Sequence, residues 1–152
     1  MTRSLAVLRL TLQIEAFGLR VRLQNPTDEP VRVWQLGNSW GGAAWSLRLT
    51  TLDGARVFTL RPSNRGYTRN LPRFVEVPAN GEADVELTPS RPEWTSGDDL
   101  SPLKEAPVSV SAVLEIEPTP ESEKHHVATG RVESAPEVSQ VPHSWLYGAS
   151  PT

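Results

Sequence analysis

Apolar and polar residues alternate along several short stretches of the chain. Over positions 6–14 the even-numbered residues are apolar, and Arg9, Thr11 and Gln13 lie between them. The same period of two recurs in three later stretches: 17–24, 45–51 and 108–116. Such alternation is typical of β-strands that bury one face, whereas no helical period persists over three turns. The pattern therefore predicts an all-β fold.

Turn signals separate these stretches. The segment 25–30 is dense in Asn, Asp and Pro, residues that bond their own backbone or preset its φ angle. Asp53-Gly54 predicts a two-residue β-hairpin connection, and 118–125 is expected to be a polar loop. Further short strands are expected at 31–36, 57–60, 74–77, 83–87 and 127–132. About eight or nine strands with regularly spaced turns predict an immunoglobulin-like antiparallel β-sandwich, with a closed barrel as the alternative.

The 152 residues fit one domain with its own core. We expect the β-sandwich domain to span 1–135. The remaining 136–152 form a Pro-bearing C-terminal tail, which could dock through Trp145, Leu146 and Tyr147.

Three segments carry a resemblance to a known family. VRLQNPTDEPVRV (21–33), SLRLTTLDGARVF (46–58) and VEVPANGEADVEL (75–87) resemble the first half of small bacterial immunoglobulin-like domains, such as the intracellular serine-proteinase inhibitors of bacilli. The later VSAVLEIEP and TGRVESAP are similar to the last hairpin of that architecture. The resemblance implies the sandwich fold and, as one function among others, proteinase inhibition. The long segment 88–107 and the tail depart from the family pattern.

Charge and composition exclude several classes of partner. The formal net charge of −3 argues against binding to nucleic acid or to an anionic membrane. The chain has no cysteine, which excludes disulfides and thiolate chemistry. No apolar run approaches the roughly 18 residues of a membrane helix, and charged residues interrupt the apolar N-terminal stretch. We expect a cytoplasmic protein.

Catalytic and metal-binding motifs are weak. His125 and His126 are adjacent and would point to opposite faces of a strand, so a solvated turn is the favoured interpretation. Asp98, Asp99 and Glu93 lack the spacing of a calcium loop. No nucleophile elbow or phosphate-binding loop occurs. The sequence therefore predicts no catalytic residues, no metal site and no cofactor, and a protein that is not an enzyme.

The direction of the chain predicts where a binding site would lie. If every connection reverses the chain, the long segments 37–42, 61–70 and 88–107 share one end of the sandwich. The short connections 25–30, 53–54, 78–81 and 118–125 would share the other end. Aromatic and arginine side chains are enriched in binding hot spots. The candidate partner-binding residues in the long segments are Trp40, Arg65, Tyr67, Arg69 and Trp94.

Other interpretations of these residues stay open. Trp40 and Trp94 could fold back to close the end of the core, while Trp34 and Trp45 are expected inside it. Arg9, Arg20, Arg22 and Arg48 could block unwanted strand pairing, or an unprotected edge strand could accept a strand from a partner.

The predicted function is a non-enzymatic protein-binding module, such as an inhibitor or a toxin-neutralising immunity protein. Its expected partner is another protein, and the chain itself is expected to be a monomer or a weak homodimer. The alternatives are a carbohydrate-binding module that uses exposed aromatic residues, and a structural or accessory domain of a larger assembly.

Overall fold

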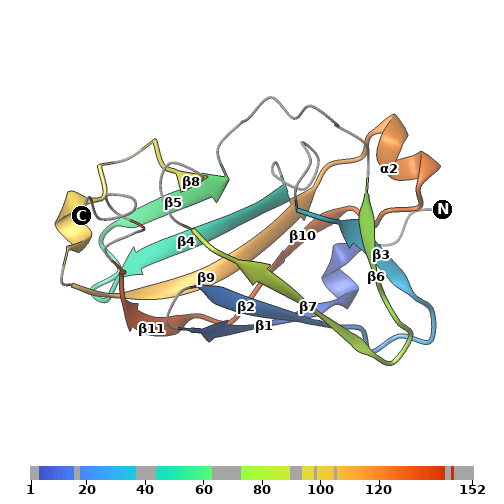
Figure 1. Ribbon diagram of the computed structural model, residues 1–152, viewed down its shortest axis with the longest axis horizontal. Helices are drawn as coiled ribbons and strands as arrows, with labels where there is room; N and C mark the ends of the chain where they lie inside the picture. Colours follow the sequence, from blue (N-terminus) through green and yellow to red (C-terminus); the bar gives the residue numbers. More distant parts are fainter. Residues whose placement is uncertain are drawn as a thin grey trace, which may run out of the picture.

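The computed structural model describes residues 4–15, 18–36, 44–62, 73–89, 94–97, 99–104, 106–142 and 145. Within them the chain forms antiparallel β-sheets with three short helices (Figure 1). The all-β prediction is confirmed.

The smaller of the two main sheets has three strands in the order β1-β2-β7. They are β1 (Arg9–Ile14), β2 (Leu19–Gln24) and β7 (Glu82–Leu87). Exposed and buried residues alternate along β1 and β2, as the period of two predicts. Gly18 allows the reversal between β1 and β2 to approach β7 closely, because a Cβ atom there would lie 2.6 Å from the Leu87 carbonyl oxygen.

The larger sheet has the order β10-β9-β4-β5-β8, and β11 also pairs with β9. Its strands are β4 (Trp45–Thr51), β5 (Val57–Pro62), β8 (Trp94–Thr95), β9 (Pro107–Ile116), β10 (Gly130–Glu133) and β11 (Glu137–Gln140). The segment 88–107, predicted as a loop, thus supplies β8 and the short helix η2 (Ser101–Leu103). The predicted tail begins with a strand of this sheet, and Trp145 is buried beyond it.

Strands β10 and β11 are one strand interrupted by a bulge. Gly130 pairs with Ile116 and Glu137 with Val110, so the register shifts by one residue between the two segments. In the gap, the Ala112 N–H donates to the Ser134 hydroxyl at 2.9 Å, and the Ser134 N–H donates to the Ala112 carbonyl at 2.9 Å. The Ser134 hydroxyl thereby accepts from the Ala112 N–H, which the interrupted strand pairing would otherwise leave without a partner.

A separate two-stranded ribbon, β3 (Val31–Trp34) with β6 (Phe74–Val77), stands at the end of the molecule near α2 (Figure 1). Helix α2 (Pro120–Lys124) replaces part of the polar loop predicted at 118–125. Its signal is a capping box: the Thr119 hydroxyl accepts from the Ser122 N–H, and the Ser122 hydroxyl accepts from the Thr119 N–H. Near the N-terminus lies η1 (Leu5–Val7), whose Leu5 N–H donates a hydrogen bond to the Thr129 carbonyl at 2.7 Å.

The inner faces of both main sheets contribute to one hydrophobic core. Trp34 and Trp45 belong to it, at 3% and 1% exposure, as predicted. Each such side chain contributes roughly 2–3 kcal/mol of favourable burial before chain entropy is counted. None of the helices in the described ranges is long and apolar enough to cross a membrane.

In two connections between strands, a side chain bonds to the backbone of the turn. The first is the β2–β3 connection, which Asn25 joins to the β6–β7 turn. It is 2% exposed, and its side-chain amide nitrogen lies 2.7 Å from the Glu29 carbonyl oxygen. The same nitrogen lies 3.2 Å from the carbonyl oxygens of Val77 and Pro78. The amide oxygen accepts from the Thr27 N–H and hydroxyl. Both polar atoms of its side chain therefore have partners.

The second connection is the β4–β5 hairpin, which confirms the hairpin predicted at Asp53-Gly54 but not its two-residue length. The connection is longer than two residues, because the Thr51 N–H bonds the Arg56 carbonyl across it. The Asp53 carboxylate accepts from the Thr51 hydroxyl at 2.6 Å and from the Ala55 N–H at 2.9 Å. Gly54 has a φ of 75°, a conformation that favours glycine.

Candidate functional site

Most of the predicted partner-binding residues lie outside the described residues. Trp40 falls in 37–43, and Arg65, Tyr67 and Arg69 fall in 63–72. Trp94 is described: it is the first residue of β8, is 6% exposed and belongs to the core. This is the core-closing arrangement that the sequence left open for it, and its ring is covered by the chain's own atoms.

The described ends of 37–42 and 61–70, and strand β8 within 88–107, nevertheless meet at one end of the larger sheet. The first segment enters β4 at Trp45, and the second leaves β5 at Pro62. Leu47 pairs with Leu60, which brings these two strand ends together. The third segment enters β8 at Trp94, which pairs with Pro62. Trp45, Pro62 and Trp94, which we call the anchors, therefore lie together. The expected position of 88–107 as a whole is wrong, because this segment leads into β9, where Val108 pairs with Thr51 beside the Asp53 hairpin at the far end of β4.

The expected position of 118–125 is wrong. It was assigned to the opposite end, but Trp45 pairs with Leu114, so β9 finishes next to the start of β4. Helix α2 follows immediately and lies at the same end as the anchors. The alternation fails because β3 and β6 leave the two main sheets to form their own ribbon, so the connections do not simply reverse direction each time.

A hollow of about 310 Å³ lies at this shared end, and we call it the anchor hollow. Its described lining consists of Trp34, Ala44, Arg61, Glu115, Ile116, Glu117 and Thr119. Trp34, Ala44 and Ile116 are buried and form apolar walls, while Arg61, Glu115 and Glu117 are exposed at the rim. Such a hollow suits a side chain with an apolar stem and a polar tip.

An aromatic contact fixes α2 beside the anchor hollow. The His125 ring lies 6.1 Å from the Trp34 ring and 6.2 Å from the Phe74 ring, centroid to centroid. The Arg32 guanidinium stacks 4.3 Å above Phe74 and donates to the His125 carbonyl at 3.0 Å. His125 thus packs against the ribbon, whereas His126 is exposed with a φ of 56°. The two histidines do not converge on one ion.

The remaining metal candidates are not assembled in the described residues. Asp98 and Glu93 lie outside those residues, and Asp99 accepts from the Ser101 N–H and hydroxyl. No group of three His, Asp or Glu side chains in the described ranges could hold a metal ion.

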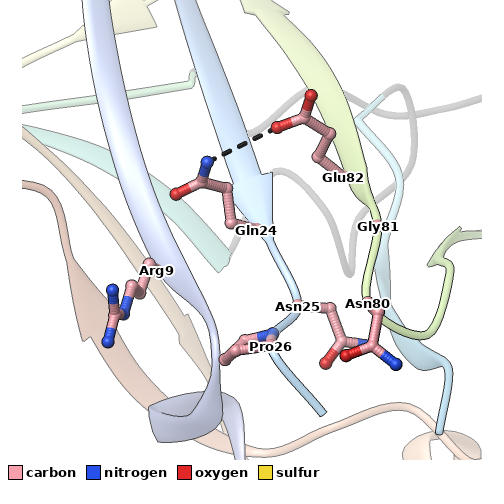
Figure 2. A pocket seen from close by; sticks show the side chains of 7 residues that line it. All are labelled: Arg9, Gln24, Asn25, Pro26, Asn80, Gly81 and Glu82. Carbon is pink, nitrogen blue, oxygen red and sulfur yellow. Dashed lines mark hydrogen bonds between the residues drawn. The ribbon is translucent and has the colours of Figure 1, made fainter. Parts of the chain in front are cut away.

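A second hollow, of about 570 Å³, lies at the end of the small sheet where β2 ends and β7 begins (Figure 2). Its described lining consists of Arg9, Gln24, Asn25, Pro26, Asn80, Gly81 and Glu82 and contains no aromatic ring. Figure 2 shows the Gln24 amide turned toward Glu82, with Arg9 apart from them on β1. A sugar-stacking platform of the kind expected for the carbohydrate alternative is therefore missing from this lining.

Two carboxyl groups have clearly shifted pKa values in the described part, and both shifts favour the charged form. The Thr51 hydroxyl and the Ala55 N–H lower the pKa of Asp53. A hydrogen bond and ion pair with Arg22 lower the pKa of Asp84. A general acid needs the opposite shift, so these groups stabilise turns and sheets.

Comparison with known proteins supplies no family for the chain: no family model, no curated protein and no solved structure matches it.

Proposed function

We propose that the chain is a non-enzymatic protein-binding module on an immunoglobulin-like β-sandwich. It contacts another protein through the long loops at the end where β4 begins and β5 ends. Within this class, the proposal is an inhibitor or a toxin-neutralising immunity protein.

The convergence of the loop anchors carries the proposal. Trp45, Pro62 and Trp94 are brought together by backbone pairing, so the sequences attached to them start from one small area. Those sequences contain Trp40, Arg65, Tyr67 and Arg69. Loops on a rigid scaffold that carry aromatic and arginine residues are a common form of protein-binding site.

The anchor hollow adds a second supporting feature. Its rim has two carboxylates, Glu115 and Glu117, beside one guanidinium, Arg61. Glu115 is only weakly engaged, at 4.0 Å from Arg131. A lysine or arginine of the partner could place its stem against the apolar walls and its charge between the carboxylates.

The test compares two double variants in affinity capture from a lysate of the source organism. Trp40→Ala with Tyr67→Ala should release the captured partner, because each hot-spot side chain contributes about 2 kcal/mol or more. Trp94 is left unchanged, since its removal would open a cavity in the core. The matched control is Leu52→Ala with Val57→Ala, which removes exposed apolar side chains at the opposite end.

Equal capture by both double variants would refute the loop-end site. A panel of serine proteinases, assayed with and without the protein, separates the two forms of the proposal. Inhibition favours the inhibitor that the family resemblance implies, whereas a captured toxin favours the immunity protein.

A further inference from the structure

Strand β7 has one edge that faces away from β2. In the small sheet β7 pairs with β2 on one side, and no described strand pairs with its other side. The edge spans the six residues of β7, which is long enough to form a regular ladder with an added strand.

The backbone direction along β7 follows from one hydrogen bond. The Asn25 N–H donates to the Gly81 carbonyl at 2.9 Å, and these two residues continue the β2–β7 register. Odd-numbered residues of β7 therefore face β2. Because successive residues of a strand point their N–H and C=O groups to opposite sides, those of Glu82, Asp84 and Glu86 point to the free edge.

The side chains of the same three residues lie on the outer face, 37–56% exposed. On the β2 side the sheet matches them with basic residues: Arg20 Nε is 2.8 Å from Glu86, and Arg22 Nε is 3.0 Å from Asp84. On the side of β7 that faces away from β2, no described strand supplies basic residues to these carboxylates. The alternate side chains, Ala83 and Val85, point inward and are only partly buried.

Self-pairing of this edge is unfavourable. An antiparallel pair of two β7 strands centred on Asp84 would set Asp84 against its own copy and Glu82 against Glu86. Like charges directly opposite each other destabilise a sheet. The acidic column therefore discriminates against a second copy and favours a strand of opposite charge.

We propose that the β7 edge binds an extended segment of another protein in which basic residues alternate with apolar ones. The basic side chains lie opposite Glu82, Asp84 and Glu86, and the apolar ones cover Ala83 and Val85. Backbone bonds to the three free residues complete the added strand. This site is independent of the proposed loop-end function.

The test uses a capped seven-residue peptide that alternates lysine and valine, titrated into the full-length protein. Binding is followed by amide chemical shifts, and hydrogen exchange of Glu82, Asp84 and Glu86 is measured with and without peptide. Saturable binding should slow exchange at these three amides. A peptide with serine in place of lysine should bind about tenfold more weakly or worse.

Two variants locate the site. Asp84→Pro removes an edge N–H that takes no part in the β2 ladder, a change that an edge strand tolerates, and should weaken binding at least about tenfold. Glu82→Gln with Glu86→Gln should also weaken it. The matched control, Glu121→Gln with Glu123→Gln, removes the same charge from α2 and should bind like the wild type, as should the Trp40 and Tyr67 double variant.

Several results would overturn the proposal: no saturable binding to the wild type, protection at other amides, or equal loss in the edge and α2 variants. Serine and lysine peptides of equal affinity would also refute it. If Asp84→Pro does not fold, the two glutamine pairs still decide the outcome.

Discussion

The two connections around Asn25 and Asp53 use the same local motif in opposite surroundings. In each, a side-chain oxygen accepts from the backbone N–H two residues later and, at 2.6 Å, from a threonine hydroxyl. This Asx-type turn is a common way to reverse a chain. Asn25 is buried, however, whereas Asp53 lies on the surface.

The surroundings decide which residue type each turn can use. The second polar atom of Asn25 faces three carbonyl oxygens, so it must be a donor, and an amide nitrogen is one. Asp53 is exposed, and a charge on the surface is well solvated. Burial thus requires the amide at one turn and permits the carboxylate at the other.

The largest expected effect comes from exchanging the buried group. Asn25→Asp keeps the shape but sets an anion against three carbonyl oxygens. We expect a loss of about 3–5 kcal/mol in the free energy of unfolding, the cost of an uncompensated buried charge. Urea denaturation at neutral pH measures it.

The loss should shrink in acid, because a protonated carboxyl can again donate. Asn25→Ala serves as the control and should cost less, about 1–3 kcal/mol, for the unpaired backbone groups that it leaves. If Asn25→Asp were no worse than Asn25→Ala, the required donor would not be the reason for the amide.

An intermediate effect is expected at the hairpin backbone. Gly54 has a positive φ, and no atom lies within 4 Å of where a Cβ would be. Gly54→Ala should therefore cost about 1 kcal/mol for conformation alone. Asn80 in the β6–β7 turn, which Asn25 contacts, provides the comparison because it also has a positive φ, of 53°. Asn80→Gly should leave stability nearly unchanged, and thermal unfolding of both variants would show whether the two turns tolerate this conformation alike.

The smallest effect is expected at Asp53. Its pKa is lowered in the folded protein, so its contribution to stability is present above the unfolded pKa and is lost as the pH falls through the folded pKa. Asp53→Asn should barely change stability in acid and lower it slightly at neutral pH. Paired urea titrations at the two pH values measure the difference, and a loss of the same size at both would contradict the assignment.

The alternation of apolar and polar residues predicted the strands well where one face is buried and the other is exposed to solvent. Residues 9–14 and 19–24 are such strands, and inward apolar residues such as Leu12 and Val21 fix their register. Helix α2 was missed because its five residues show no period, although Thr119 and Ser122 carry its cap. Strand β11 was missed because it is short and mostly exposed.

The candidate site was predictable only in part. The shared end of 37–42 and 61–70 followed from chain reversal. The positions of 88–107 and α2 did not, because tertiary pairing of β3 with β6 removed two strands from the main sheets. Trp94 is buried in β8, which pairs with Pro62 of β5, a residue far from it in sequence. The free edge of β7 likewise follows from sheet order, which local patterns do not encode.

The position of β9 sets an order of events during synthesis. The small sheet needs only the first 87 residues, whereas the larger sheet cannot close until β9, which pairs with β4, β10 and β11, has been made. While the chain is being translated, the apolar inner face of the small sheet can therefore exist before its full cover does. Exposed faces and late long-range pairing favour association between nascent chains. Between translation of Leu87 and Ile116, the strands of the small sheet are complete while the central strand of the larger sheet is still being made.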